Sequence, residues 1–350
     1  MLGEFDCPDL TTFFRIFILN RDLLSNGTNW SASMTNTVSG LLAPLNSLSN
    51  ATLNIAAHYD LSNEMFAGFL SDDMTYSCPI WKLRGPGKPS SESLYDAQIR
   101  KLDHIADQAR IKSTDHVLEI GTGWGSFAIR AVQRLGCRVT SLTLSKEQKE
   151  LAERRISEAG LKDRITVLLC DYRLHKPEIG GVYDKIVSIE MLEAVGRDYL
   201  NTYFSCMDRL LKRDGGIAVF QCITIPEARY EAYSRSDDFI RKYIFPGGHL
   251  PSVAQLIASI NAGSKGHLIV DNVSNIGPHY ARTLRTWKEN FLSNFDTFRS
   301  ELKGDPEVFR RKWEYYFTYC EAAFNTKTLG DHIITVAREG ALEQLEGVPL

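Results

Sequence analysis

Residues 117–126 have the sequence Val-Leu-Glu-Ile-Gly-Thr-Gly-Trp-Gly-Ser, and they decide the fold of this chain. The apolar segment 116–120 before the glycines is short, which is typical of an inner strand of a parallel sheet. The three alternate glycines allow a tight turn and a close approach between the backbone and a ligand. Residues 127–132 then indicate a helix whose first N–H groups face the turn. The stretch therefore predicts a strand, a turn and a helix that together bind a nucleotide.

The same stretch also favours one kind of nucleotide. A dinucleotide fingerprint has a third glycine at the place of Ser126 and an acid at the end of the second strand, which holds a ribose. The second predicted strand, 137–143, ends without an acid, whereas Glu119 suits a ligand that carries a positive charge. Glu-x-Gly-x-Gly-x-Gly after a strand is the first motif of S-adenosylmethionine (SAM) methyltransferases. An NAD site or an ordinary strand–helix turn remains the alternative from this stretch alone.

An alternation of strands and helices begins at residue 116. Strands are predicted over 116–120, 137–143, 165–170, 184–189, 216–223 and 329–338. Helices are predicted over 126–135, 145–159, 198–212, 279–294 and 306–326. Residues 225–285 interrupt the alternation and indicate a helix-rich insertion that forms a lid. The predicted fold class is therefore α/β, a doubly wound Rossmann-like sheet that binds ligands at the carboxyl ends of its strands.

The residues around this sheet divide into further parts. Residues 1–55 are rich in Ser, Asn and Thr, and we expect a peripheral extension. Within it, 13–24 predicts an amphipathic helix that touches either a membrane or the main domain, and packing on the domain is the favoured interpretation. A helical lid and substrate segment is expected over 56–115, with an amphipathic helix over 91–110. The methyltransferase domain and a tail follow over 116–340 and 341–350.

Composition excludes several classes of protein. The net charge of the 350-residue chain is −3, so its overall field does not favour nucleic acid. Its seven cysteines are scattered without the paired spacing of metal ligands, which indicates reduced thiols and no metal site. The acidic start lacks the basic region of a signal peptide, and the apolar run 13–19 is too short to span a bilayer. We therefore expect a cytoplasmic protein, peripheral at a membrane where its substrate requires it.

Five further motifs resemble segments of the cyclopropane-fatty-acid synthases and the mycolic acid cyclopropane synthases. These motifs are 76–78 (YSC), 143–148 (TLSKEQ), 188–196 (SIEMLEAVG), 243–248 (YIFPGG) and 315–320 (YYFTYC). The resemblance runs from about residue 58 to residue 340, in the order and at the spacing of the family. Residues 327–332 (KTLGDH) also resemble fungal relatives that methylate sphingolipids.

The resemblance implies a set of SAM-binding residues. They form a lid over the methionine end, the glycine turn, the contacts to adenosine and a flank for the adenine. The lid is formed by Tyr76 and Ser77, and the glycine turn by Gly121, Gly123 and Gly125. The adenosine contacts come from Thr143, Leu144 and Gln148, and the adenine is flanked by Asp171 and Tyr172. Glu119 joins them from the motif itself. Adenosine contacts from 143–148 explain why no acid ends the second strand.

The resemblance also implies the reaction. In the family, the alkene of a lipid chain attacks the sulfonium methyl group, and a base removes a proton from the new methyl so that a ring closes. This chemistry needs an apolar cavity, aromatic faces that stabilise a cation, and a base within reach. Tyr280 and Tyr316 are the candidates for the aromatic wall. Cys320 matches the family's late cysteine, and a lining role suits it better than a nucleophilic one, because a thiolate beside a carbocation would be alkylated.

The base that the resemblance implies is a bound bicarbonate, held by a cysteine, a glutamate, a tyrosine and a histidine. The matching residues are Cys78, Glu193, Tyr280 and, in the place of the histidine, Gln221. An amide can donate to an anion but cannot carry its proton. The backbone N–H of Ile223 is a further expected donor, and Glu190 is a competing carboxylate nearby.

These observations predict a SAM-dependent enzyme that adds a methylene to a double bond of an unsaturated lipid or phospholipid and so forms a cyclopropane. A lipid C-methyltransferase, such as one acting on a sphingolipid base, is the nearest alternative. A small-molecule N-methyltransferase and a non-enzymatic lipid-binding protein fit the anion site and the SAM motif less well. We expect Arg282, Arg285 and Lys288 to meet lipid phosphates at a membrane surface, and a homodimer is left open.

Overall fold

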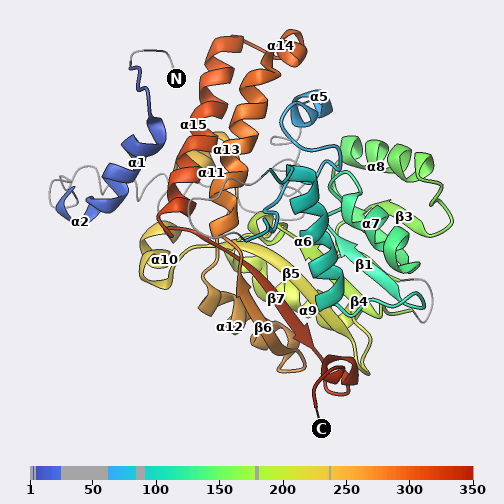
Figure 1. The fold of residues 1–350 in the computed structure, drawn as a ribbon. Helices are drawn as coiled ribbons and strands as arrows, with labels where there is room; N and C mark the ends of the chain where they lie inside the picture. The colour runs from blue at the N-terminus through green and yellow to red at the C-terminus, as the bar shows by residue number, and fades with distance from the viewer. Residues whose placement is uncertain are drawn as a thin grey trace.

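The computed structural model describes residues 3, 5–24, 62–83, 91–177, 181–235 and 238–349 (Figure 1). Those parts of the predicted extension and lid segment that fall in 25–61 and 84–90 lie outside the described residues. The predicted division of the chain into an extension, a lid segment, a main domain and a tail stays a prediction.

A seven-stranded sheet forms the centre of the described chain, in the order β3-β2-β1-β4-β5-β7-β6. Its strands are β1 (His116–Ile120), β2 (Arg138–Thr143), β3 (Ile165–Leu169), β4 (Lys185–Ile189), β5 (Ile217–Thr224), β6 (Ile269–Asn275) and β7 (Gly330–Ala337). The pairs from β3 to β5 are parallel, and β7 is antiparallel to both of its neighbours. The order runs outward in both directions from β1 and β4, so the sheet is doubly wound, as predicted for an α/β fold.

Helices cover both faces of this sheet, because successive residues of each inner strand point to opposite faces. Val117 and Val139 join the core formed with α6 (Leu94–Gln108), α7 (Ser126–Leu135) and α8 (Lys146–Glu158). Leu118, one residue after Val117, and Leu142, three residues after Val139, join the core formed with α9 (Leu200–Leu210) and α12 (Val253–Ser264). The observed bounds of the six predicted strands differ from the predicted bounds by no more than one residue at either end.

Two long helices stand beside each other above the carboxyl ends of the parallel strands (Figure 1). They are α13 (Pro278–Ser293) and α15 (Pro306–Asn325), and each has a proline in its first turn, where the missing N–H costs nothing. Between them, Phe291 and Trp313 stack with centroids 6.1 Å apart. Phe69, which follows the short helix α5 (Asn63–Ala67), joins them with its ring centroid 5.9 Å from that of Trp287. This aromatic core ties the segment 62–83 to the end of the chain.

The predicted insertion after β5 is more varied than expected. It contains α10 (Glu227–Ser234) and α11 (Phe239–Tyr243), but α12 packs on the sheet, and β6 pairs with β7 as an edge strand. The sequence did not predict β6. Most of its residues are exposed, Asp271 and Asn272 interrupt its apolar pattern, and its register shifts between Val270 and Asn272. A bulged edge strand lacks the regular alternation by which a strand is predicted.

The first described helices are α1 (Leu10–Leu19) and α2 (Arg21–Leu24), and α1 lies along α15 (Figure 1). The ring centroid of Phe14 lies 5.1 Å from that of Tyr315 and 5.6 Å from that of Tyr319. The hydroxyl of Thr11 donates to Glu321 at 3.3 Å. In the structure, α1 therefore packs on the main domain, which was the favoured of the two interpretations.

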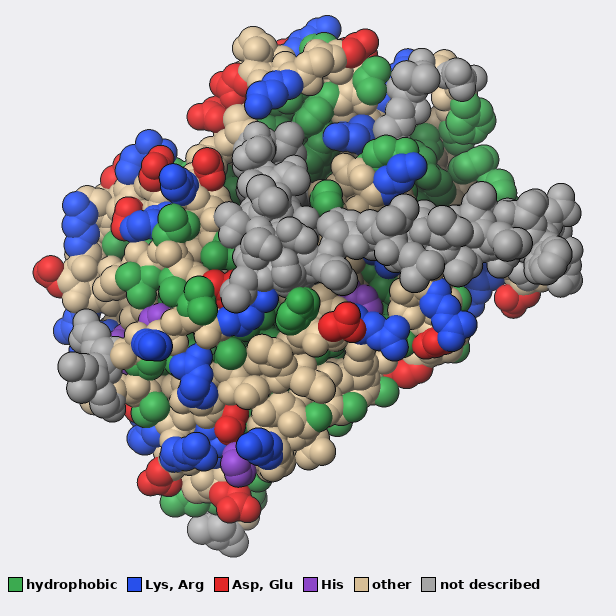
Figure 2. All heavy atoms as spheres, turned by 180° about the vertical axis from the view of Figure 1, so that it is seen from behind, with side chains coloured by type: hydrophobic (Ala, Val, Ile, Leu, Met, Phe, Trp, Pro, Cys, Tyr) green, Lys and Arg blue, Asp and Glu red, His purple; other side chains and the backbone are tan. Residues whose placement is uncertain are grey.

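The basic residues expected at a membrane surface lie against other parts of the protein. Nitrogen atoms of Arg285 and Lys288 lie 2.6 Å and 3.9 Å from the carboxylate of Glu321. The guanidinium of Arg282 lies 3.6 Å from the centre of the Trp81 ring. On the face drawn in Figure 2, basic and acidic side chains are interspersed over the described surface. Membrane contact through these residues stays a prediction.

Several short elements complete the described chain. They are α14 (Phe295–Phe298) and the 3₁₀ helices η2 (Leu192–Ala194), η3 (Arg197–Tyr199), η4 (Arg299–Glu301) and η5 (Leu342–Leu345). Among the described helices, none combines the length and the hydropathy needed to cross a membrane. The described residues also contain no group of three or more His, Cys, Asp or Glu that could hold a metal ion.

Candidate active site

The glycine turn lies where β1 ends and α7 begins. Gly121, Gly123 and Gly125 have φ angles of 100°, 52° and 86°, in the left-handed region that favours glycine. The N–H groups of Gly121 and Thr122 donate to the carbonyl of Leu142 at 2.9 Å and 3.1 Å, which fixes the turn against the end of β2. A Cβ placed on Gly123 would meet no atom within 4 Å. Gly123 therefore borders open space.

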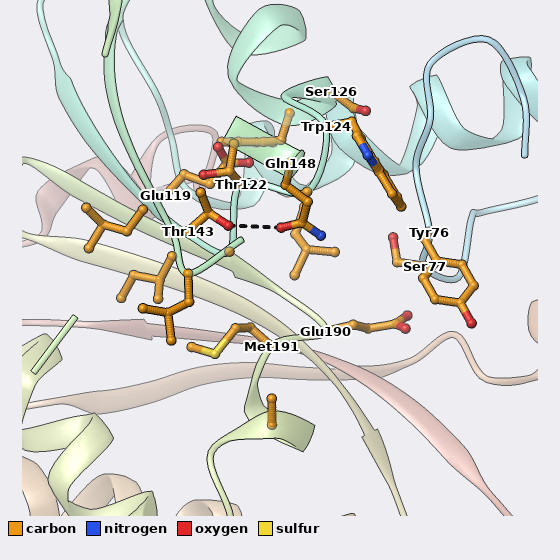
Figure 3. Close-up of a pocket in the computed structure, with 18 of the residues that line it drawn as sticks. Tyr76, Ser77, Glu119, Thr122, Trp124, Ser126, Thr143, Gln148, Glu190 and Met191 are labelled. Atoms are coloured by element: carbon orange, nitrogen blue, oxygen red, sulfur yellow. Dashed lines mark hydrogen bonds between the residues drawn. The ribbon is translucent and has the colours of Figure 1, made fainter. Parts of the chain in front are cut away.

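That space is a cavity of about 170 Å³ beside the turn (Figure 3). Every residue predicted to bind SAM lines it, with the exception of Gly125. Gly125 instead precedes α7 as its N-cap, and a Cβ there would lie 3.3 Å from the Cβ of Ala152 on α8. The third glycine is thus needed for close packing between helices, and the first two border the ligand space.

One wall of this cavity comes from the end of β2 and the start of α8. The hydroxyl of Thr143 donates to Oε1 of Gln148 at 2.9 Å, the dashed line in Figure 3. The hydroxyl of Ser145 accepts from the backbone N–H of Gln148 at 3.2 Å and so caps α8. The side-chain nitrogen of Gln148 is turned toward the side of Ser77 (Figure 3). It is therefore placed to donate to a ligand.

Glu119 contributes a buried carboxyl group to the same cavity. It accepts a hydrogen bond from the hydroxyl of Ser141, whose oxygen lies 2.7 Å from that of Thr122. Burial raises the pKa of Glu119 to about 8, although the Ser141 hydrogen bond and the charge of Lys101 oppose the rise. A nearby positive charge on a ligand would favour the ionised form of this carboxyl group.

The opposite wall is the segment that contains Tyr76 and Ser77. Nζ of Lys101 donates to the hydroxyl of Ser77 at 2.5 Å, and Nε2 of Gln98 donates to its carbonyl at 2.8 Å. The hydroxyl oxygens of Tyr76 and Tyr316 lie 2.9 Å apart. The segment is thereby held by α6 on one side and by α15 on the other.

Asp171 and Tyr172 border the cavity after β3, as predicted. Asp171 forms an ion pair of 2.6 Å with Arg173, whose guanidinium lies 5.7 Å from the centre of the Tyr172 ring. Sequence reasoning missed Arg173, which also lines the cavity. The side chain of Arg173 pairs with the Asp171 carboxylate and lies near the ring of Tyr172.

A second cavity, of about 250 Å³, adjoins the first. Apolar and aromatic side chains from α1, α11, α13, α15 and the end of β5 dominate its lining. Examples are Ile18, Ile225, Ile240, Leu284, Tyr316 and Phe324. Tyr76, Glu190 and Ala194 line both cavities, so the two spaces meet at these residues.

The aromatic residues predicted for the wall of the substrate cavity are present in it. Tyr280 stacks on Phe324 with centroids 4.5 Å apart, and Tyr316 lies on the same helix as Phe324. Cys320 also lines this cavity, and burial raises the pKa of its thiol far above the usual range. A neutral thiol agrees with a lining role and not with that of a nucleophile.

Glu190 lies at the junction of the cavities and is the centre of a hydrogen-bonded cluster. Its Oε1 accepts from the backbone N–H of Cys78 at 2.8 Å and from Nε2 of Gln221 at 2.7 Å. Its Oε2 accepts from the hydroxyl of Tyr280 at 2.6 Å. The backbone of Glu190 has a φ of 47°, which is unusual for a residue other than glycine.

Two further carboxyl groups surround this centre. Nε2 of Gln221 also lies 2.7 Å from Oδ2 of the fully buried Asp331. Oε1 of Glu193 accepts from the backbone N–H of Ile223 at 2.6 Å, while its Oε2 has no hydrogen-bond partner among the described residues. Burial raises the pKa of Glu193 to about 8, and burial with the charge of Glu190 raises that of Asp331 far above its usual range.

The structure thus brings together four residues that sequence reasoning assigned to one anion site. They are Cys78, Glu193, Gln221 and Tyr280. Sequence reasoning missed Asp331 and the fully buried Lys101. Asp331 left a signal, because it places a carboxylate on the mainly apolar strand predicted over 329–338. Lys101 left none, because the amphipathic helix predicted over 91–110 carries several other charges.

Solved structures with this architecture include SAM-dependent methyltransferases. Mycolic acid cyclopropane synthase CmaA1, complexed with SAH and CTAB, matches at a TM-score of 0.71 and 29% identity, over 82% of this chain and 98% of that one. Coclaurine N-methyltransferase bound to N-methylheliamine and SAH matches at a TM-score of 0.73 over 96% of each chain, and its 20% identity shows likeness of fold alone. The fold and its first cavity define the class of this protein, a SAM-dependent methyltransferase.

Sequence comparison narrows this class. A family model described as mycolic acid cyclopropane synthetase matches residues 46–332. Tuberculostearic acid methyltransferase UfaA1 of Mycobacterium tuberculosis is 42% identical over 97% of this chain and 78% of the relative. Cyclopropane-fatty-acyl-phospholipid synthase of Escherichia coli is 33% identical over 94% of this chain and 79% of the relative. The chain belongs to the mycolic acid cyclopropane synthetase family, which confirms the resemblance of its motifs.

Proposed function

We propose that this protein transfers the methyl group of SAM to a carbon–carbon double bond in the acyl chain of a lipid. One observation carries the proposal. A cavity lined by the predicted SAM-binding residues meets a mainly apolar cavity at Tyr76, Glu190 and Ala194. A methyl group at the junction would face an acyl chain in the second cavity. The names of the two relatives, both of which refer to fatty acyl chains, support this class of substrate.

In the proposed complex, the backbone at Gly121 and Gly123 approaches SAM closely, and Gln148 donates to its adenosine. Tyr76 and Ser77 cover the methionine end, and Glu119 faces the positive charge of the ligand. Thr143, Leu144, Asp171 and Tyr172 complete the adenosine side. Gly125 supports the turn through its packing on α8.

In the proposed reaction, the electron pair of the alkene forms a bond to the methyl carbon of SAM. The carbon–sulfur bond breaks, its pair stays on sulfur, and the other alkene carbon becomes a cation. The rings of Tyr280, Tyr316 and Phe324 present faces that stabilise this cation without offering a nucleophile. The apolar lining excludes water, which would otherwise trap the cation as an alcohol. Loss of a proton then gives a neutral product.

The two outcomes of proton loss define two candidate products. Loss of a proton from the new methyl group closes a cyclopropane, the product that the sequence favoured. Loss from a carbon next to the cation leaves a methyl-branched alkene. The 42% identity to a tuberculostearic acid methyltransferase favours a methyl branch, and the 33% identity to a cyclopropane synthase favours the ring. Both products carry one CH₂ more than the substrate.

The test is a lipid assay with the purified protein and SAM. Vesicles of a monounsaturated phospholipid should gain one CH₂ per modified chain by mass spectrometry, and vesicles of the saturated analogue should not change. Proton NMR of the extracted lipid then distinguishes a ring from a branch. A protein that binds SAM but methylates amines, and leaves the unsaturated lipid unchanged, would contradict the proposal.

A further inference from the structure

We infer that Glu190 is the base of this reaction and that it replaces, as part of the protein, the bicarbonate expected at this position. The inference rests on the proposed function and adds the group that accepts the proton. Glu190 is the one carboxyl group among the described residues that lines both cavities. Glu119 lines only the first, Glu193 lines only the second, and Asp331 lines neither. Glu190 alone can therefore reach the point where the new carbon–carbon bond forms.

The hydrogen bonds of Glu190 explain why bicarbonate does not fit. Cys78, Gln221 and Tyr280 were expected to hold an anion, and all three donate to Glu190, Cys78 through its backbone N–H. A bicarbonate ion would have to displace a carboxylate that is covalently tethered at the same place. The tethered group has the advantage of a much higher effective concentration. The donors therefore hold the anion that the chain itself supplies.

Glu190 also retains the capacity to accept a proton. An ionised carboxylate has about four acceptor sites, and the three donors use three of them. Burial raises the pKa of Glu190, although the hydrogen bonds from Cys78 and Tyr280 and the charge of Lys101 oppose the rise. Asp331, in contrast, has a pKa raised far above its usual range, so it keeps its own proton. The three hydrogen-bond donors stabilise the ionised form of Glu190, and its raised pKa makes the carboxylate a stronger acceptor of a proton.

Gln221 positions this base. Its Nε2 donates to Glu190 and to Asp331, both at 2.7 Å, so one amide group spans the two carboxyl groups. The amide cannot take the proton itself, because it has no basic site of the required strength. Gln221, which stands in the place of the expected histidine, therefore orients the carboxylate of Glu190. A histidine at this position could itself have carried a proton.

The backbone of Glu190 supplies an independent argument. Its φ of 47° lies in the left-handed region, which glycine adopts without strain and a residue with a side chain adopts at a cost. Strained backbone of this kind persists where a particular side chain is required, and it is concentrated at active sites. The carboxylate is retained at a position where glycine would be the residue of lower energy.

A proton leaves the new methyl carbon, or a carbon next to the cation, and binds an oxygen of Glu190. The electron pair of that C–H bond forms the ring bond or the alkene bond and neutralises the cation. Glu190 becomes a neutral acid, and it returns its proton to solvent after the product leaves.

The test compares the parent protein with Glu190→Gln and Glu190→Gly in buffer depleted of bicarbonate and in buffer with added bicarbonate. Lipid product is measured by mass spectrometry, and SAM binding is measured by calorimetry. Glu190→Gly relieves the backbone strain, so it is expected to fold. Lys265→Gly is the matched control, because Lys265 has a φ of 56° and lies on the surface, outside both cavities.

We expect the parent and Lys265→Gly to work at full rate without bicarbonate. Both Glu190 variants should bind SAM as the parent does and lose on the order of 10²–10⁴ in rate. Added bicarbonate should restore part of the rate of Glu190→Gly, which leaves space for an anion, and not that of Glu190→Gln. A parent that requires bicarbonate, or a Glu190→Gln variant with the parent's rate, would overturn the inference. A parent with no lipid product in either buffer would instead refute the proposed function, and the inference with it.

Discussion

Glu119 and Glu190 are both carboxyl groups beside the first cavity, but the structure surrounds them differently. Glu190 receives three hydrogen bonds from the protein, whereas Glu119 is 3% exposed and receives one, from the hydroxyl of Ser141. Burial raises the pKa of Glu119 to about 8, because it outweighs the Ser141 hydrogen bond and the charge of Lys101. Glu119 therefore depends on its ligand for a compensating charge, which makes SAM binding sensitive to pH.

This dependence gives the first prediction. A cationic ligand favours the ionised form of Glu119, so SAM binding at pH 7 should release close to one proton, because the free group with a pKa of about 8 is mostly protonated at that pH. SAM affinity should rise as the pH rises to about 8 and then level off. Calorimetry in two buffers of different protonation enthalpy measures the release. Glu119→Gln should abolish it, and equal binding enthalpies for the parent in both buffers would contradict the assignment.

A second prediction concerns the effect of a side chain at Gly123 on SAM binding. A side chain there would meet no protein atom within 4 Å, but it would enter the first cavity. Gly123→Leu should weaken SAM binding at least tenfold, which corresponds to about 1.4 kcal/mol. Gly160→Leu is the matched control, since Gly160 also has a positive φ of 70° and open space at its Cβ, but lines neither cavity. Equal SAM affinities for the two variants would refute the site.

At the scale of elements, α1 forms part of the wall of the second cavity. Phe14 packs against two tyrosine rings of α15, and Ile18, one turn further along, lines the second cavity. The sequence indicated an amphipathic helix in this region, but not that one of its residues borders the substrate. That contact depends on how α1 docks on α15, which the periodicity of α1 alone does not specify.

The position of Ile18 can be tested by overfilling the cavity. Ile18→Trp should raise the KM for the lipid on the order of tenfold, because a site that holds an acyl chain is sensitive to small changes in its volume. SAM affinity should not change. Leu19→Trp is the control, because Leu19 is 69% exposed on the same helix. An unchanged KM for Ile18→Trp would remove α1 from the substrate site.

Elements with a regular pattern could be predicted from the sequence, and those without one could not. The helix predicted over 126–135 matches α7 residue for residue, because a glycine turn precedes it and Gly136 ends it in the left-handed conformation. The strand β6 escaped prediction, since an exposed edge with a bulge has no buried face to repeat every second residue. Local signals therefore predicted the sheet's inner strands better than its antiparallel edge.

At the scale of the whole molecule, the hydrogen-bonded cluster around Glu190 is assembled from distant segments. Cys78, Glu190, Gln221, Tyr280 and Asp331 lie on five different parts of the chain and meet in one hydrogen-bonded group. The resemblance could identify Cys78, Tyr280 and the substitution at Gln221. It could not show that Glu190 takes the donors, because that depends on the backbone angles and packing at the end of β4.

Two arginine side chains line the second cavity. Arg229 of α10 lines the apolar cavity and donates to the carbonyl of Thr328 at 3.1 Å, and within the described part of the chain no carboxylate forms an ion pair with it. Arg241, which lines the cavity as well, lies 3.8 Å from Asp238. A cation without a carboxylate partner at the edge of an apolar cavity suits the anionic end of a lipid.

Arg229→Gln should therefore raise the KM for vesicles of phosphatidylglycerol by roughly tenfold, with a smaller effect on kcat. Arg235→Gln is the control, because Arg235 is exposed and pairs with Glu231 on the same helix. The initial rate of CH₂ addition, followed by mass spectrometry over a range of lipid concentrations, gives both constants. Equal KM values for the two variants would contradict a role for Arg229 in lipid binding.

The central claim is that the methyl carbon of SAM is bonded to an acyl-chain carbon. The most direct measurement is mass spectrometry of a monounsaturated phospholipid after incubation with the protein and SAM whose methyl group carries deuterium. We expect label in the acyl chain, with one deuterium lost if a ring closes and all of it retained if a methyl-branched alkene forms. An unlabelled acyl chain, or label confined to the headgroup, would contradict the account.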